Sequence, residues 1–238
     1  MTLRVRTLWL FGLTLAFGST LAAGCGGDGG DARIAVNWAV AYVGPEPTTC
    51  DAAGTPTVRL EARRSGSTQL YSFDFDCAPL NGLTDYIPPG NYDVTLSLLD
   101  LKKRPVASTT GNFNINRRGT NELTPVQFQV QAFQVSWLLV VKGPGNAMRT
   151  STCAELGVKT IEFSAQLSSE SAGETYRFEC LENPGLGLTS AIRTGNYAYQ
   201  FRLLDATDKP LTESDLKPLV VGGGNQLAIV PAETFTFM

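Results

Sequence analysis

The sequence predicts an all-β protein made of two tandem antiparallel β-sandwich modules, and three observations support this prediction. The chain contains an internal duplication, its apolar residues alternate over short segments, and glycine, proline and asparagine separate those segments. The offset between the two copies grows only from 99 to 105 residues, so few insertions are needed. We expect a first module at residues 33–131 and a second module at residues 132–238, each long enough to bury a modest core. The matched landmarks are Trp38 and Trp137, Cys50 and Cys153, Cys77 and Cys180, and Tyr92 and Tyr197.

The N-terminal segment has the layout of a secretory signal. Arg4 and Arg6 precede an apolar run at residues 8–17, which is shorter than the roughly 20 residues that a membrane-spanning helix needs. Residues 21–25 then resemble the lipobox of bacterial lipoproteins, in which the chain is cut before a cysteine that receives the lipid. We therefore expect residues 1–24 to be removed as a signal peptide and Cys25 to carry the lipid.

The lipobox departs from the usual pattern at one position, because Ala22 stands where leucine is usual, three residues before the cysteine. The alternative is ordinary signal cleavage near Ala23, which leaves Cys25 as a free thiol. Residues 25–32 are rich in glycine and predict a flexible tether. Gly26 stands where many Gram-negative lipoproteins carry an aspartate that retains them at the inner membrane, so the resemblance implies the outer membrane of the cell envelope.

Each module is expected to begin with a half-buried strand. Apolar side chains alternate from Ile34 to Tyr42 in the first module and from Phe133 to Val141 in the second. Residues 212–217, which lie between two prolines, predict a short helical turn. Further strands, with counterparts in the second module, are predicted at 57–62, 70–77, 91–99, 106–115 and 123–130.

The two modules are expected to follow each other without a flexible linker. Val126, Phe128 and Val130 alternate up to the boundary, and the apolar parity then shifts by one residue at Phe133. One strand should therefore hand over to the next within one or two residues, which fixes the relative orientation of the modules.

A tryptophan on an early strand and a pair of cysteines give each module an immunoglobulin-like pattern, although the second cysteine precedes the repeated tyrosine instead of following it. Residues 87–96 resemble the Pro-x-Gly-x-Tyr strand entry of transthyretin-like (prealbumin-like) and carboxypeptidase-regulatory-like domains. The counterpart at residues 193–197 lacks the prolines. This resemblance implies a β-sandwich and transfers no functional residue. We expect the Tyr92 and Tyr197 hydroxyls to tie the turns that precede them.

The five cysteines divide into Cys25 and two pairs. Cys50 and Cys77 are 27 residues apart, and so are Cys153 and Cys180. Four cysteines allow three pairings, but the repeated spacing favours one disulfide inside each module, and export to an oxidising compartment permits it. The alternative is a zinc site, which needs closely spaced ligand pairs that these cysteines do not form.

Composition narrows the classes of function. After removal of Arg4 and Arg6, 17 basic and 22 acidic residues leave a net charge of −5, without a basic patch for nucleic acid. The short basic runs at 63–64 and 102–104 are expected to be solvated or to protect strand edges. The chain contains no histidine, which excludes Ser-His and Cys-His catalysis and histidine metal sites. We expect no cofactor and no metal.

Carboxylates, lysines and tyrosines remain as catalytic groups, and among these a carboxylate pair is the candidate. Asp74 and Asp76 share one face of a predicted strand, opposite its apolar face. We interpret them as a solvated strand face, with calcium binding or catalysis as alternatives. Trp38 and Trp137 are expected in the cores and not as platforms for sugars.

Exposed recognition is expected on loops at the sandwich ends, where the candidates are Tyr86, Glu46, Asn146 and Arg149. The sequence thus predicts a non-enzymatic envelope lipoprotein, held to the membrane by the lipid on Cys25, that acts as a binding, adhesive or structural module. Its expected partner is an envelope protein or a polysaccharide, and no nucleic acid. The alternatives are a polysaccharide-binding accessory module and a carboxylate-dependent hydrolase.

Overall fold

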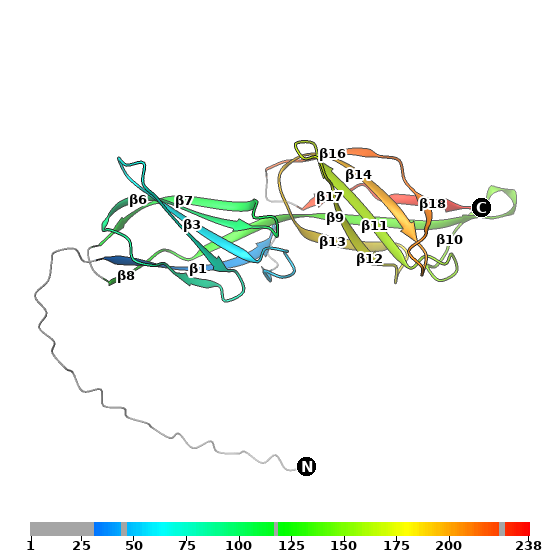
Figure 1. Ribbon diagram of the computed structural model, residues 1–238. Helices are drawn as coiled ribbons and strands as arrows, with labels where there is room; N and C mark the ends of the chain where they lie inside the picture. Colours follow the sequence, from blue (N-terminus) through cyan, green and yellow to red (C-terminus); the bar gives the residue numbers. More distant parts are fainter. Residues whose placement is uncertain (1–30, 44–46, 117–118, 224–226) are drawn as a thin grey trace, which may run out of the picture.

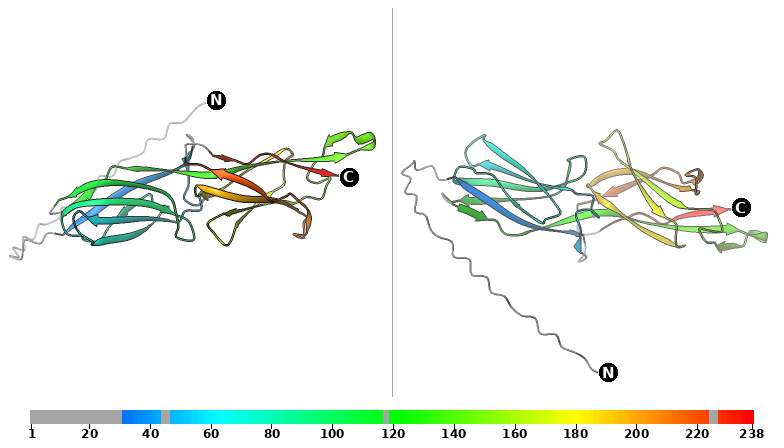
Figure 2. Two further views of the ribbon diagram at one scale, coloured as in Figure 1. Left: turned by 90° about the horizontal axis from the view of Figure 1, so that it is seen from above. Right: turned by 60° about the horizontal axis from the view of Figure 1, so that its bottom comes forward.

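The computed structural model describes residues 31–43, 47–116, 119–223 and 227–238, which form two β-sandwiches in tandem (Figure 1). The two lie end to end in an elongated molecule (Figure 2). The described residues contain one short 3₁₀ helix, η1 (Pro144–Asn146), and no α-helix. The predicted all-β sandwich class is confirmed. The predicted signal peptide, Cys25 and most of the predicted tether lie outside the described residues.

Strands β1 to β8 and the start of β9 build the first module. Their bounds are β1 (Ala32–Tyr42), β2 (Pro47–Thr48), β3 (Thr57–Arg64), β4 (Leu70–Asp76), β5 (Asn81–Leu83), β6 (Gly90–Leu99), β7 (Pro105–Ile115), β8 (Gly119–Glu122) and β9 (Val126–Lys142). One sheet has the strand order β4-β3-β6-β7. The facing layer is built on β1, which pairs antiparallel with β2 and β5 and parallel with β8 and β9.

Strands β10 to β18 repeat this arrangement around the rest of β9. Their bounds are β10 (Met148–Thr150), β11 (Thr160–Leu167), β12 (Glu174–Glu179), β13 (Gly185–Ile192), β14 (Gly195–Leu204), β15 (Pro210–Glu213), β16 (Lys217–Val221), β17 (Ala228–Ile229) and β18 (Glu233–Phe237). One sheet has the order β12-β11-β14-β15, with β16 also beside β14. In the facing layer β10 and β13 pair antiparallel with β9, and β17 and β18 pair parallel with it.

Strand β9 belongs to both modules. Its residues 126–130 pair with β1, whereas residues 131–137 pair with β13. The predicted handover therefore takes place inside one strand of 17 residues and not between two strands. The parity shift is visible as four successive buried residues at 130–133. Continuous backbone joins the modules, which agrees with the expectation that no flexible linker separates them.

Two further features differ from the sequence-based expectation. The helical turn predicted at 212–217 is wrong, because this segment contains the end of β15, a loop and the start of β16. Ser214 holds the loop against the neighbouring strand, since its N–H donates to the Phe201 carbonyl at 2.9 Å and its Oγ accepts from the Phe201 N–H at 3.0 Å. The layers around β1 and β9 are also mixed, with parallel pairs beside the expected antiparallel ones.

The alternating side chains build two hydrophobic cores, one in each module. Trp38 and Trp137 lie in these cores and are 5% and 3% exposed, so they are core residues and not platforms for sugars. Each indole packs against a phenylalanine of the facing sheet, Phe75 or Phe178, with ring centroids 6.1 and 6.0 Å apart.

Both predicted disulfides are present, one in each module. The Cα atoms are 5.9 Å apart for Cys50 and Cys77 and 5.8 Å apart for Cys153 and Cys180. The cysteines therefore form no zinc site. The first bridge ties the loop before β3 to the end of β4, and the second ties the loop before β11 to the end of β12.

The repeated tyrosines tie their turns as expected. The Tyr92 hydroxyl donates to the Pro88 carbonyl at 2.6 Å, and the Tyr197 hydroxyl donates to the Arg193 carbonyl at 2.8 Å. Both rings are buried. The repeat thus preserves this contact although the second copy lacks the prolines.

Candidate functional site

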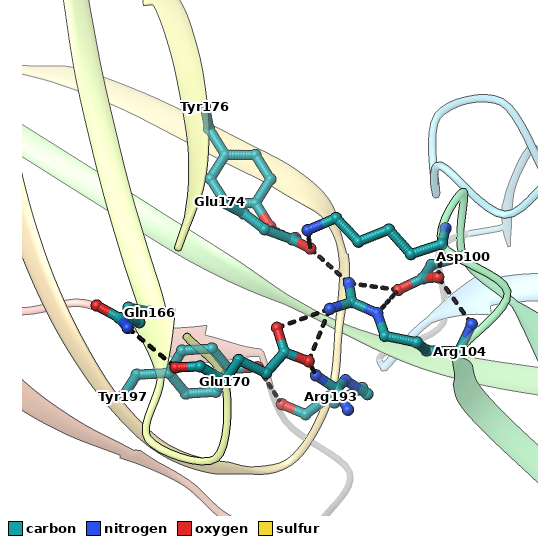
Figure 3. Close-up of polar contacts among 9 residues, drawn as sticks. Asp100, Arg104, Gln166, Glu170, Glu174, Tyr176, Arg193 and Tyr197 are labelled. Atoms are coloured by element: carbon teal, nitrogen blue, oxygen red, sulfur yellow. Dashed lines mark hydrogen bonds and ion pairs between the residues drawn. The ribbon is translucent and has the colours of Figure 1, made fainter. Parts of the chain in front are cut away.

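A cluster of charged side chains lies at the junction between the two modules (Figure 3). The β6–β7 turn of the first module, residues 100–104, meets the β11–β12 hairpin of the second module, residues 168–173. The two turns lie more than 60 residues apart in the chain, and only the end-to-end arrangement of the sandwiches brings them together.

The sequence of the β6–β7 turn fixes the position of Arg104. Oδ1 of Asp100 accepts hydrogen bonds from the backbone N–H groups of Lys102 at 2.8 Å and Arg104 at 2.9 Å. Lys103 takes the left-handed conformation with φ of 60°. The turn therefore directs the Arg104 side chain out of the first module and toward the second (Figure 3).

Arg104 is bound by three carboxylates. Its Nε donates to Oδ2 of Asp100 at 2.7 Å, within its own turn. Across the junction, Nη1 lies 2.7 Å from both oxygens of Glu170, and Nη2 lies 2.5 Å from Oε1 of Glu174. Only 23% of the Arg104 side chain is exposed, so water competes weakly with these charge-assisted bonds.

Two more cations and a tyrosine complete the cluster. Arg193 forms an ion pair with Glu170, and Nζ of Lys102 lies 3.0 Å from Oε1 of Glu174. The Tyr176 hydroxyl donates to Oε2 of Glu174 at 2.9 Å. Three carboxylates are therefore matched by three cations, and the charges of the cluster balance within it. Such an arrangement fastens the two modules to each other.

The pKa values follow from these contacts. Burial by itself raises the pKa of Glu174, but hydrogen bonds from Arg104, Lys102 and Tyr176 outweigh it and hold this pKa below its usual value. Burial, together with the neighbouring Glu174 carboxylate, raises the pKa of Tyr176. Tyr176 thus stays protonated and donates, while Glu174 stays ionised and is not set up as a general acid.

Backbone contacts join the modules beside this cluster. The Ala191 N–H donates to the Ala53 carbonyl at 2.9 Å, and Ala191 belongs to the core of the first module. Gly54 has φ of 63° and lies so close to Ser190 that a Cβ at residue 54 would stand 2.9 Å from the serine Cβ. The loop that follows Cys50 is therefore part of the junction and not a free recognition loop.

An open cleft of about 370 Å³ lies beside the cluster, between the β6–β7 turn, Gly54 and Gly173. Its charged lining residues are members of the cluster and already bind one another.

Among the described residues no group of three or more His, Cys, Asp or Glu side chains is arranged to hold a metal ion. The residues described also include no helix that is long and apolar enough to span a membrane.

The predicted recognition residues do not come together at one site. Tyr86 is 64% exposed and lies beside the start of β1, where the Arg33 guanidinium stands 5.4 Å from the centre of its ring. Asn146 ends η1, and Arg149 in β10 is exposed with Nη1 3.5 Å from Glu155 Oε2. These two lie at the opposite end of the molecule from Tyr86 (Figure 1). Glu46 lies outside the described residues.

The acidic pair is solvated as expected. Asp74 and Asp76 are both exposed on β4. The Asp74 carboxylate accepts two hydrogen bonds from Arg59, at 2.7 and 2.9 Å, and lies 3.4 Å from Lys103 Nζ. The Arg59 hydrogen bonds are the largest influence on the pKa of Asp74 and lower it. Asp74 is thus held as an ion-paired carboxylate.

Sequence reasoning missed the junction cluster. Arg104 was expected to be solvated or to protect an edge, and the structure shows it mostly buried between the modules. The contributing acids, Glu170 and Glu174, stand 66 and 70 residues away, and no local pattern connects them to Arg104. One signal exists in the sequence, since the turn Asp100 to Arg104 recurs as Asp205 to Lys209.

No protein-family model matches the chain, and no curated protein matches it. Among solved structures it is similar to a leucine-rich repeat protein from Bacteroides thetaiotaomicron, 12% identical, over 87% of this chain and 27% of that one, with a TM-score of 0.32. It is similar to the TIE protein of Bacillus anthracis, 11% identical, over 87% of this chain and 34% of that one, with a TM-score of 0.39.

A third similar structure is a candidate cell adhesion protein from Bacteroides fragilis, 13% identical, over 87% of this chain and 91% of that one, with a TM-score of 0.40. The chain spans only 27% and 34% of the length of the first two proteins. The finer assignment to immunoglobulin-like or transthyretin-like sandwiches, and the module boundaries, remain predictions.

Proposed function

We propose that the protein is a non-catalytic adhesive or structural module of the cell envelope, held to the membrane by a lipid on Cys25. In this proposal it carries a recognition surface at a fixed distance from its membrane-proximal end. The observation that supports it is the junction, where the continuous strand β9 and the Arg104 cluster join the two sandwiches end to end.

The positions of the two ends of the molecule indicate which end lies near the membrane in this proposal. Strand β1 begins at the outer end of the first module, directly after the predicted tether. The connection between β9 and β10, which carries η1, lies at the opposite end, beside strand β18 (Figure 1). A lipid on Cys25 therefore leaves Asn146 and Arg149 far from the membrane and Tyr86 near it.

Membrane anchoring is tested with the full chain. Cells that express the wild-type chain and the Cys25→Ala variant are fed an alkyne-labelled fatty acid and then separated into membrane and soluble fractions. We expect label and membrane location for the wild type and loss of both for the variant. Labelled Cys25→Ala protein, or unlabelled wild-type protein, would contradict lipidation at this cysteine.

Recognition is tested with the oxidised chain from residue 31 onward, which contains all described strands. It is offered solubilised envelope proteins and, in parallel, insoluble cell-surface polysaccharides. We expect saturable retention that Arg149→Ala weakens at least tenfold and that Tyr86→Ala, the matched control at the other end, leaves unchanged. Equal retention of both variants and the wild type would exclude the distal surface, with Arg149, as the binding site.

A second candidate function is polysaccharide binding at the near end, favoured by the exposed Tyr86 ring with Arg33 beside it. Exposed aromatic rings stack on sugar rings through their apolar faces. This candidate predicts the reverse result, in which Tyr86→Ala abolishes retention on polysaccharide and Arg149→Ala does not.

A further inference from the structure

Strand β7 is an unprotected sheet edge. Within the part of the chain that the structure describes, it pairs only with β6. None of its 11 residues is charged, and its proline is the first residue, Pro105. The register shift in its pairing lies at its beginning, opposite Leu98 and Leu99, so residues 107–115 are regular. Edge strands normally carry charges, internal prolines or bulges that prevent pairing with another chain.

Several other edge strands of the molecule have such protection. Strand β13 has no charge, but a bulge between Leu188 and Ala191 interrupts it. Further cases are charges in β4 (Asp74, Asp76), in β12 (Glu174, Arg177, Glu179) and in the short strand β15 (Glu213), and a charge with an internal proline in β16 (Lys217, Pro218). Strands β15 and β16 together take the place of β7 in the second module. The same edge is therefore divided there into two short, protected strands.

The start of β9 lies near β7 in the facing layer. A groove of about 340 Å³ runs between this strand and residues 123–127. The half-buried Phe113 and Val126 line it above the buried Val94, Leu96 and Leu123, and none of its lining residues is charged. The inward-facing side chains of a strand added to β7 would therefore cover apolar surface.

We propose that β7 pairs antiparallel with β7 of a second copy of this chain, about a two-fold axis at Thr110. Thr110 is the central residue of the strand. A two-fold axis places each residue opposite one of the same strand, so like charges of a charged edge come together. Strand β7 has no charged residues that could repel those of the second copy. Its residues pair with those of the second copy in reverse order. Thr110 opposes itself, Thr109 opposes Gly111, Ser108 opposes Asn112, and Ala107 opposes Phe113.

The charged residue nearest to the β7 edge on the outer face of the sheet does not oppose pairing with a second copy. Asp93 lies one strand back from the edge, opposite Asn112. In the paired state two β7 strands lie between the two Asp93 side chains, which are therefore at least about 14 Å apart, from three strand spacings of about 4.8 Å. This exceeds the screening length of about 8 Å at physiological ionic strength, so the repulsion is small. The inference goes beyond the proposed function and does not depend on it.

Charge placement at the axis is the first test. Sedimentation velocity of the oxidised chain from residue 31 onward should show a reversible monomer–dimer equilibrium. Thr110→Lys places two ammonium groups opposite each other and should raise the dissociation constant at least tenfold, as should Thr110→Glu. An equimolar mixture of the two variants should restore the dimer. Ser72→Lys, on the other edge of the same sheet, is the matched control and should dimerise like the wild type.

Cross-linking then tests the register. Thr110→Cys should form a covalent dimer under mild oxidation. Ser108→Cys and Asn112→Cys should do so only when the two are mixed. A wild-type chain that stays monomeric at all concentrations, or a dimer that Thr110→Lys does not weaken, would overturn the proposal. So would a dimer whose Thr110→Cys variant does not cross-link. Circular dichroism of each variant confirms that the fold is retained.

Discussion

The two modules contain the same turn and use it differently. Oδ1 of Asp205 accepts from the N–H groups of Thr207 at 2.7 Å and Lys209 at 3.0 Å, as Asp100 does in the first module. Asp208 has φ of 62°, which matches Lys103. In the first module the turn ends in Arg104, which binds the second module. In the second module it ends in Lys209, which is exposed at the far end.

The loops after the first cysteine of each pair show the same contrast. Gly54 and Gly157 occupy equivalent positions with φ of 63° and 67°. A Cβ at Gly54 would meet Ser190, whereas one at Gly157 would meet nothing within 4 Å. The junction is therefore built from turns that every copy of the repeat contains. Only the side chains that face the neighbouring module, above all Arg104, distinguish the joined end from the exposed end.

The largest expected effect tests whether the two modules are equivalent in stability. Replacing Cys50 and Cys77 by alanine should cost about 3.5 kcal/mol of unfolding free energy, and replacing Cys153 and Cys180 should cost the same. The reason is that both bridges close loops of equal length. Urea denaturation of the two double variants measures both losses. Unequal losses, by more than about 1 kcal/mol, would show that the modules differ in strain or in their unfolded states.

The two tryptophans should differ by a smaller amount in what their replacement costs in unfolding free energy. Trp38 Nε1 donates to the Cys77 carbonyl at 3.1 Å, whereas Trp137 Nε1 is buried without a hydrogen-bond partner among the described residues. Trp38→Phe and Trp137→Phe leave similar cavities, but only the first removes a buried hydrogen bond. We expect Trp38→Phe to lose about 1 kcal/mol more unfolding free energy. Equal losses in urea denaturation would mean that this bond contributes nothing net.

The features that the sequence predicted correctly are local or repeated. Period-two alternation placed Trp38 in the core, equal spacing paired Cys50 with Cys77, and position within the repeat tied Tyr92 to its turn. The junction could not be predicted, because Arg104 meets Glu170 only after both modules have folded and docked. The repeat also concealed this contact, since Lys209 at the equivalent position has a similar charge.

Arg104 and Lys209 form the next matched pair. Arg104→Ala leaves the Glu170 and Glu174 carboxylates at the junction without their shared partner, and we expect a loss of about 2 kcal/mol of unfolding free energy. Lys209→Ala should change it by less than about 0.5 kcal/mol, as for other exposed side chains. Spin labels in the two modules should give a narrow distance distribution in the wild type and the Lys209→Ala variant and a broader one in Arg104→Ala. A narrow distribution in Arg104→Ala would mean that β9 alone fixes the orientation.

The smallest effect concerns pH. Because the folded pKa of Glu174 is lowered, its contribution is fully present above the unfolded pKa of about 4.3 and is lost as the pH falls through the folded value. The groups that face it are Arg104, Lys102 and Tyr176. The spin-label distance distribution should therefore broaden below about pH 4.

Glu174→Gln separates this effect from other acid-sensitive contacts. Asp74 also has a lowered pKa, but its partner Arg59 lies in the same module, so protonation of Asp74 weakens the first module without loosening the junction. The variant should already show a broader distribution at neutral pH and a smaller further change in acid. If wild type and Glu174→Gln broaden equally as the pH falls, another carboxylate of the cluster, Asp100 or Glu170, controls the junction. The difference between the two modules would then depend on how Arg104 distributes its hydrogen bonds among Asp100, Glu170 and Glu174.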